Sequence, residues 1–225
     1  MNTTVELVNQ WAAFEEKHSQ GNIEDFCRHY LITRREKENT GKLFGKMGLP
    51  PKNIITLTKL LNRINKLNTL YIQLAMSETG VEHLDEFLFL TTIANMKTPM
   101  KTEVIYYNFS ELSTGLLILE RLKKKKYITE YDNPDDKRSR QIKITSRGEK
   151  ILKGCYARFG KVHEMMYRDL SEDDIKLCIQ LLQNVEIKFS ALWQKHKGRM
   201  FEDVYGSMMG KNHKTKKAYG LYNID

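Results

Sequence analysis

The chain has 225 residues, of which 40% are hydrophobic and 29% charged, and it carries a net charge of +9. This composition is typical of one well-cored domain with extensions or of two small domains, and no apolar run approaches the ~18 residues of a membrane span. The cysteines Cys27, Cys155 and Cys178 form no CxxC pair, which argues against a disulfide framework or a zinc site. The N-terminus does not resemble a signal peptide, so the sequence favours a reducing, cytoplasmic setting.

Residues 1–49 are expected to form a helical extension followed by a linker. Apolar residues at mostly helical spacing predict a helix over 3–19, and Asn22 with Asp25 three residues later indicates the start of a second helix. The segment 37–53 contains three glycines and two adjacent prolines, a composition typical of a linker.

A long helix is predicted over 54–78, because apolar residues recur there at steps of three and four. Gly80 is expected to end it. A helix of this length with one apolar seam needs a partner, and so does a last helix that begins at Ser171, where Asp174 completes a capping box. We therefore predict homodimer contacts on both helices, at Leu57, Leu60, Leu61, Ile64, Ile179, Leu182, Phe189 and Trp193.

The centre of the chain predicts a helix-turn-helix followed by a β-hairpin. A buried helix over 82–95 precedes two short helices over 100–108 and 111–124, the second with Ser110 as its N-cap. Strands are predicted over 127–131 and 141–144, and the charged segment between them is too polar to be buried. Such a hairpin after a helix-turn-helix is a wing.

Two features complete the predicted fold. Ser146 and Glu149 form a capping box for the helix after the wing, and the basic segment 199–225 has no apolar period, which favours a mobile tail. The fold class is therefore mainly α, a winged helix-turn-helix with a small hairpin, flanked by N- and C-terminal dimerisation helices. The DNA-binding core is expected over 82–147, within a domain over 50–198.

The positive charge is concentrated in the predicted winged helix. Residues 97–147 contain twelve basic against seven acidic residues. A local basic surface suits a polyanion, because neutralising phosphates releases condensed counterions. In a winged helix the second helix of the turn enters the major groove, and a basic wing tip reaches the minor groove. We predict DNA contacts at Lys101, Thr102, Ser113, Thr114, Lys123, Lys137, Arg138 and Arg140, with Asp136 holding the Arg138 side chain.

The segment from the recognition helix to the next helix resembles MarR-family regulators. Residues 136–139 (Asp-Lys-Arg-Ser) match the family's wing pattern Asp-x-Arg-Ser, and residues 144–148 (Ile-Thr-Ser-Arg-Gly) resemble its Leu-Thr-x-x-Gly. The resemblance covers about residues 54–196. It implies a homodimer with intertwined terminal helices, binding to double-stranded DNA at a pseudo-palindromic operator, and release by a small-molecule effector.

One position departs from the family pattern, and one glycine has two interpretations. Many members carry polar or basic groups in the middle of the recognition helix, whereas this chain has Leu116 and Leu117. Base recognition is therefore expected to depend on Ser113, Thr114 and the wing. Gly115 allows either close approach to DNA or close packing between helices.

Alternatives from other classes remain. The winged helix could dock protein partners without binding DNA. A thiol sensor would use Cys27, which neighbours Arg28 and His29, whereas Cys155 and Cys178 lie on apolar faces and are expected in the core. An enzyme is disfavoured, because the sequence has no Gly-rich phosphate loop, HExxH or Gly-x-Ser-x-Gly motif. No metal or cofactor is predicted.

Overall fold

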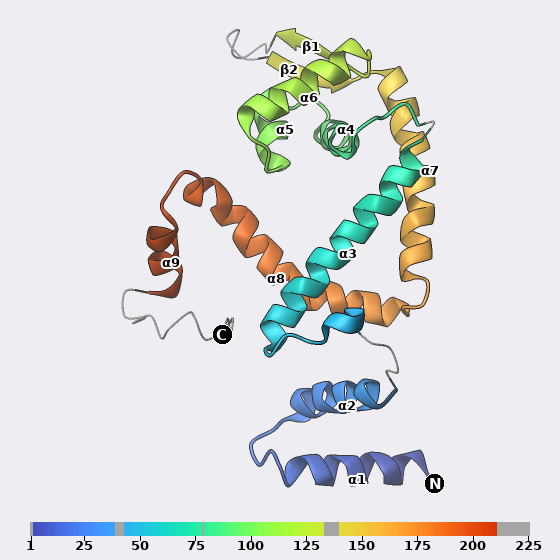
Figure 1. Cartoon of the computed structure of the whole chain (residues 1–225), viewed down its shortest axis with the longest axis vertical. Helices are drawn as coiled ribbons and strands as arrows, with labels where there is room; N and C mark the ends of the chain where they lie inside the picture. The colour runs from blue at the N-terminus through green and yellow to red at the C-terminus, as the bar shows by residue number, and fades with distance from the viewer. Residues whose placement is uncertain (1, 39–42, 78, 133–139, 211–225) are drawn as a thin grey trace. The chain divides into compact units, whose positions relative to one another are not determined.

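The structure is a computed structural model, and it describes residues 2–38, 43–77, 79–132 and 140–210 (Figure 1). The chain divides into two compact units, Met1–Thr56 and Leu57–Asp225. Within the described residues, no helix is long and apolar enough to cross a membrane.

The first unit contains two helices and a short 3-10 helix: α1 (Thr3–Glu15), α2 (Ile23–Glu38) and η1 (Gly45–Met47). The predicted start of α2 is confirmed, since the Asp25 N–H donates to Asn22 Oδ1 at 3.0 Å and the Asn22 N–H donates to Asp25 Oδ2 at 3.2 Å. Phe14 and Phe26 are buried between the two helices, and the Phe26 ring lies edge-on to that of Trp11 at 5.1 Å. The segment 37–53, predicted to be a linker, contains η1, and its residues 39–42 lie outside the described residues.

The second unit follows the predicted order of helices and hairpin. Helix α3 (Asn53–Met76) begins at the boundary between the units and leads to α4, α5 and α6, the hairpin, and then α7 to α9. The bounds are α4 (Leu84–Met96), α5 (Lys101–Tyr107), α6 (Leu112–Lys124), β1 (Ile128–Asp132), β2 (Arg140–Ile144), α7 (Ser146–Tyr167), α8 (Glu172–His196) and α9 (Phe201–Met209). This mainly α architecture with a two-stranded hairpin confirms the predicted fold class.

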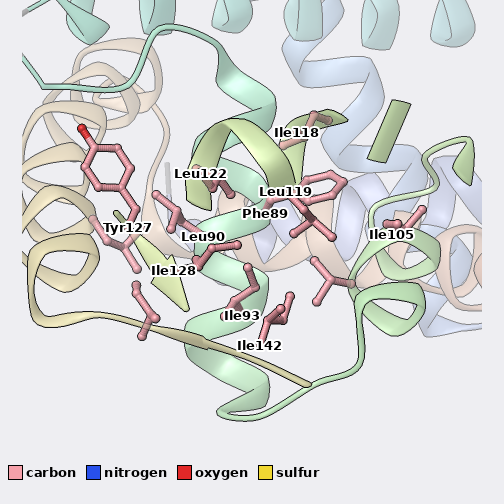
Figure 2. Close-up of a cluster of buried hydrophobic side chains, with 13 residues drawn as sticks. Phe89, Leu90, Ile93, Ile105, Ile118, Leu119, Leu122, Tyr127, Ile128 and Ile142 are labelled. Atoms are coloured by element: carbon pink, nitrogen blue, oxygen red, sulfur yellow. The ribbon is translucent and has the colours of Figure 1, made fainter. Parts of the chain in front are cut away.

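The core of the winged helix surrounds α4. Figure 2 shows Phe89, Leu90 and Ile93 of α4 among apolar side chains of α5, α6 and both strands. Gly115 has a packing role here, because a Cβ at this position would lie 2.5 Å from Cγ1 of the fully buried Ile105. Of the two interpretations of Gly115, the structure therefore supports close packing between α5 and α6.

The hairpin is antiparallel, with Ile128 opposite Ile144 and Asp132 opposite Arg140. The first strand was predicted one residue too early, and the second was predicted with the correct end but without its first residue, Arg140. Buried isoleucines on both strands face the core, and the Ile142 N–H donates to the carbonyl of Pro99 at 2.9 Å. This bond joins the hairpin to the segment just before α5.

Two predicted helix caps are wrong by one residue. Glu111, not Ser110, is the N-cap of α6, because the Ser110 N–H still belongs to the end of α5 and donates to the Ile105 carbonyl. Thr145, not Ser146, is the N-cap of α7, and its Oγ1 accepts from the Gly148 N–H at 3.1 Å. The capping box of Ser171 and Asp174 at the start of α8 is confirmed.

Helix α6 ends in a Schellman motif that leads directly into β1. The Tyr127 N–H donates to the Leu122 carbonyl and the Lys126 N–H to the Lys123 carbonyl. Lys126 adopts the left-handed conformation, with φ 61°, where glycine is usual. The Tyr127 hydroxyl donates to the Gly80 carbonyl at 2.8 Å, so this turn also fixes the segment between α3 and α4.

A second core cluster joins α3 to α7. Ile72 and Met76 pack with Cys155, Phe159 and Val162 of α7. Helix α3 ends at Met76 rather than beside Gly80, because the Thr79 N–H and hydroxyl both donate to the Met76 carbonyl. Cys155 is buried as predicted, and burial raises the pKa of its thiol, although a hydrogen bond with Thr79 opposes this.

The C-terminal helices contradict two predictions. None of the residues of α8 is buried, so Cys178 is exposed rather than in the core. Part of the segment predicted to be a mobile tail forms helix α9, and residues 211–225 lie outside the described residues. The apolar side chains of α8, among them Ile179, Phe189 and Trp193, are exposed in the single chain.

Candidate nucleic-acid interface

The helix-turn-helix presents the first turns of both its helices to solvent. Thr102 in the first turn of α5 is exposed, and so are Ser113 and Thr114 in the first turn of α6. The turn between the helices is a second Schellman motif, in which Phe109 takes the left-handed conformation at φ 52°. The predicted base-contacting residues are thus accessible, and their contact with DNA stays a prediction.

Three of the predicted DNA-contacting cations converge on one carboxylate. Lys101 Nζ lies 2.8 Å from Glu130 Oε1, and Lys123 Nζ lies 3.1 Å from Glu130 Oε2. Arg140 Nη1 lies 3.5 Å from the same Oε2, and its Nε lies 3.9 Å from Asp132. These cations come from α5, α6 and β2, so Glu130 joins the helix-turn-helix to the base of the wing.

The Glu130 side chain is only 4% exposed. A carboxylate this deeply buried needs the neighbouring cations to remain ionised. Burial by itself raises the pKa of Glu130, but hydrogen bonds from Lys101 and Lys123 outweigh it and hold the pKa below its ordinary value of 4.5. The cluster keeps a positive excess, since three cations surround one carboxylate and Asp132. The cations are therefore held in position, and the cluster keeps one net positive charge.

We predict that Glu130→Gln lowers the free energy of unfolding by about 2 kcal/mol at neutral pH, because two charge-assisted hydrogen bonds lose their anion. The folded-state pKa is depressed, so this stability is fully present above the ordinary pKa of 4.5 and is lost as pH falls through the folded-state pKa. Urea unfolding of both proteins from pH 7 to acid pH measures the difference. Glu120→Gln, at an exposed position of α6, is the control. A pH-independent difference would contradict the assignment.

The lysine run at the end of α6 contains residues with different roles. Lys125 Nζ donates to both oxygens of Glu86, at 3.1 and 2.9 Å, and the Glu86 side chain is fully buried. Burial alone lowers the pKa of Lys125, but its bonds to Glu86 and Glu82 outweigh this and raise it. Lys124 and Lys126 are exposed and form no ion pair within the described residues. Lys125 is therefore structural, and its neighbours are available for phosphate.

The other wing residues cannot be placed. Asp136, Lys137 and Arg138 lie outside the described residues, so their predicted roles at the wing tip stay predictions. The same holds for the support of Arg138 by Asp136.

The end of α8 contacts the start of the recognition helix. Lys197 Nζ lies 3.1 Å from Oε2 of Glu111, the N-cap residue of α6, and 5.9 Å from the centre of the Tyr106 ring. A predicted dimerisation helix is thus linked to the helix predicted to enter the major groove.

Sequence reasoning did not find Glu130 or Glu86. The available signal for Glu130 was its position four residues after the basic run Lys123–Lys126, because an acid near a surface that binds a polyanion is expected to pair with cations. Glu86 had less signal, because its partner Lys125 is 39 residues away in the sequence.

In the part of the chain that the structure describes, no group of three His, Cys, Asp or Glu side chains could hold a metal ion. Cys27 is exposed on α2, and its reactivity stays untested.

No protein-family model and no curated protein matches the sequence. Solved structures do match the fold. A cysteine-to-serine mutant of MarR from E. coli, complexed with operator DNA, matches with a TM-score of 0.54 and 24% identity over 59% of this chain and 94% of that chain. The apo form of wild-type E. coli MarR gives 0.51 and 23% over 57% and 95%.

Bordetella bronchiseptica BpsR, whose DNA binding is described as regulated by 6-hydroxynicotinic acid, gives a TM-score of 0.52 and 16% identity over 58% of this chain and 98% of that chain. The chain therefore has the winged helix-turn-helix fold of the MarR-family regulators.

Proposed function

We propose that this chain is a DNA-binding transcriptional regulator that acts in the cytoplasm as a homodimer on a pseudo-palindromic operator and performs no chemistry. The observation that carries the proposal is the surface formed by α5, α6 and the hairpin. The first turn of α6 is exposed there. The same surface carries Lys101 of α5, Lys123 of α6 and Arg140 of β2, which are held in position by Glu130. This arrangement offers phosphate contacts around a helix that can enter the major groove.

The MarR structure with operator DNA supports this proposal by fold. Phosphate contacts are proposed for Lys101, Lys123 and Arg140, and base or phosphate contacts for Ser113 and Thr114. Arg138 at the wing tip is proposed to enter the minor groove. Thr102 is proposed to contact phosphate at the start of α5.

The exposed apolar residues of two helices support a homodimer. In α3, Leu57 and Leu61 are 45% and 41% exposed, and in α8, Ile179, Phe189 and Trp193 are 56%, 54% and 42% exposed. A 25-residue helix without one buried residue gains little stabilisation from packing against its own chain, so it favours a partner surface. We propose that a second copy covers these residues together with Leu60, Ile64 and Leu182.

A small-molecule effector is proposed from the family resemblance and from the BpsR description. An open surface pocket lies between α3 and α7, and it is lined by Ala75, Arg158, Lys161, Val162 and Met165. Its two cationic side chains would favour an anionic ligand.

The test is selection of bound duplexes from a random pool. We expect a pseudo-palindrome with half-sites about 10 base pairs apart, two chains per duplex by sedimentation, and affinity that falls linearly on a log–log plot against salt. Arg138→Ala should lower the salt slope by roughly one per protomer. Arg168→Ala, at the exposed end of α7, is the matched control and should leave the slope unchanged. If no duplex shows salt-sensitive binding, the fold docks protein partners instead.

A further inference from the structure

The outer face of the recognition helix is apolar where base recognition is expected. Its inner face is buried through Gly115, Ile118, Leu119 and Leu122. On the outer face, Leu117 is 67% exposed, and Leu112 and Leu116 are 44% and 39% exposed. Three exposed leucines on one short helix form an apolar surface that the fold of its own chain leaves uncovered.

The polar side chains that recognise purines are missing from this stretch. Residues 112–120 (Leu-Ser-Thr-Gly-Leu-Leu-Ile-Leu-Glu) contain no Arg or Lys for guanine and no Asn or Gln for adenine. The exposed side chains that remain are Ser113, Thr114, the leucines and Glu120. In the major groove, the base group that an apolar side chain can contact is the C5-methyl of thymine.

From this placement we infer that Leu116 and Leu117 recognise thymine methyl groups in the major groove, so that the operator half-site carries thymines opposite α6. The inference rests on the proposed function, and it identifies the bases that α6 recognises. Residues 113, 116, 117 and 120 lie three and four positions apart and share one face of the helix. The leucines therefore lie between Ser113 and Glu120 along the proposed path of the groove.

Contact with a thymine methyl removes apolar surface of both partners from water. Burial of one methyl-sized group corresponds to a change of about fourfold in affinity. Two contacted thymines, one in each half-site of a dimer, therefore correspond to about fifteenfold if the half-sites act independently. Hydrogen bonds from Ser113 and Thr114 and contacts with phosphate do not change when the methyl is removed, because thymine and uracil present the same polar atoms. The methyl group of Thr114 could also contact a thymine methyl, and the leucine variants distinguish that contact from one made by Leu116 or Leu117.

The experiment replaces thymine by deoxyuridine in the duplex selected above, one position at a time, and measures the dissociation constant by fluorescence anisotropy. We expect one or more thymines per half-site at which the replacement weakens binding about fourfold. Replacement in the flanking base pairs should have no effect. Leu117→Ala and Leu116→Ala should each bind the selected duplex more weakly. For at least one of these variants, replacing the contacted thymine by uracil should no longer change the dissociation constant.

The variant and the base change form a double-mutant cycle that separates direct contact from a general loss of affinity. Lys124→Ala, as a phosphate-contact control, should weaken binding to both duplexes equally. If the selected duplex binds tightly and no uracil replacement matters, the inference is wrong and the proposed function stands. If the leucine variants keep the full thymine preference, the methyl groups are recognised by other residues and the inference is likewise wrong. If no duplex binds, the proposed function itself fails.

Discussion

Gly148→Ala is expected to lower the free energy of unfolding of the winged-helix unit by about 3 kcal/mol. A Cβ at this position would lie 2.2 Å from the carbonyl oxygen of Tyr127 and 2.8 Å from Cγ1 of Ile144. The Tyr127 oxygen is held in place because it accepts from the Thr145 N–H at 2.9 Å, and the Thr145 hydroxyl holds the preceding Lys126 carbonyl at 2.8 Å. The methyl group can be accommodated only if α7 separates from the start of the hairpin.

The measurement is urea unfolding at a fixed protein concentration, since a dimer makes apparent stability depend on concentration. Gly154→Ala in the same helix is the matched control, because its added Cβ would meet nothing within 4 Å. Alanine there should be neutral or stabilise the chain by up to about 1 kcal/mol through its higher helix propensity. Equal effects of the two substitutions would show that the contact with Tyr127 is not tight, and would contradict this account of Gly148.

The helices and the hairpin could be predicted from the sequence because each has a local periodic signal. Leu57 to Leu74 repeat at helical spacing, and Gln141 to Ile144 alternate as a strand does. Helix ends were less predictable, because Ser110 and Glu111 are both acceptable before a helix and a hydrogen bond from the preceding helix decides between them. Helix α9 is short and contains Gly206, so its period was too weak to identify.

The sequence indicated which types of residue form the candidate site, but it did not indicate which acid each cation pairs with. The predicted cations Lys101, Lys123 and Arg140 lie together around Glu130, and their contact with DNA stays a prediction. A lysine that contacts phosphate and a lysine that pairs with a buried acid look identical in sequence. Lys124 and Lys125 are adjacent, and only the direction of each side chain on the helix separates an exposed cation from the partner of Glu86. That direction depends on α4, which lies far away in the sequence, so sequence patterns could not supply it.

Lys125→Met is the substitution that separates these two roles, and it should lower the free energy of unfolding by about 3 kcal/mol. Methionine keeps most of the apolar stem but leaves the fully buried Glu86 carboxylate without its ammonium partner. Arg121 Nε lies 3.7 Å from Glu86 Oε1, and the Glu82 N–H donates to Glu86 Oε2 at 3.0 Å. Because these contacts remain, the expected loss of unfolding free energy is at the lower end of the range for a broken buried ion pair.

Lys124→Met is the matched control, with the same loss of charge at the adjacent exposed position. It should change the unfolding free energy by no more than about 0.5 kcal/mol. It should reduce the salt dependence of DNA binding, whereas Lys125→Met should leave that dependence unchanged while the protein is folded. Glu86→Gln added to Lys125→Met should restore about 2 kcal/mol, because a neutral amide tolerates burial without a cation. If both lysine variants unfold alike and both lower the salt slope, Lys125 faces the nucleic acid, and the pairing with Glu86 does not determine its role.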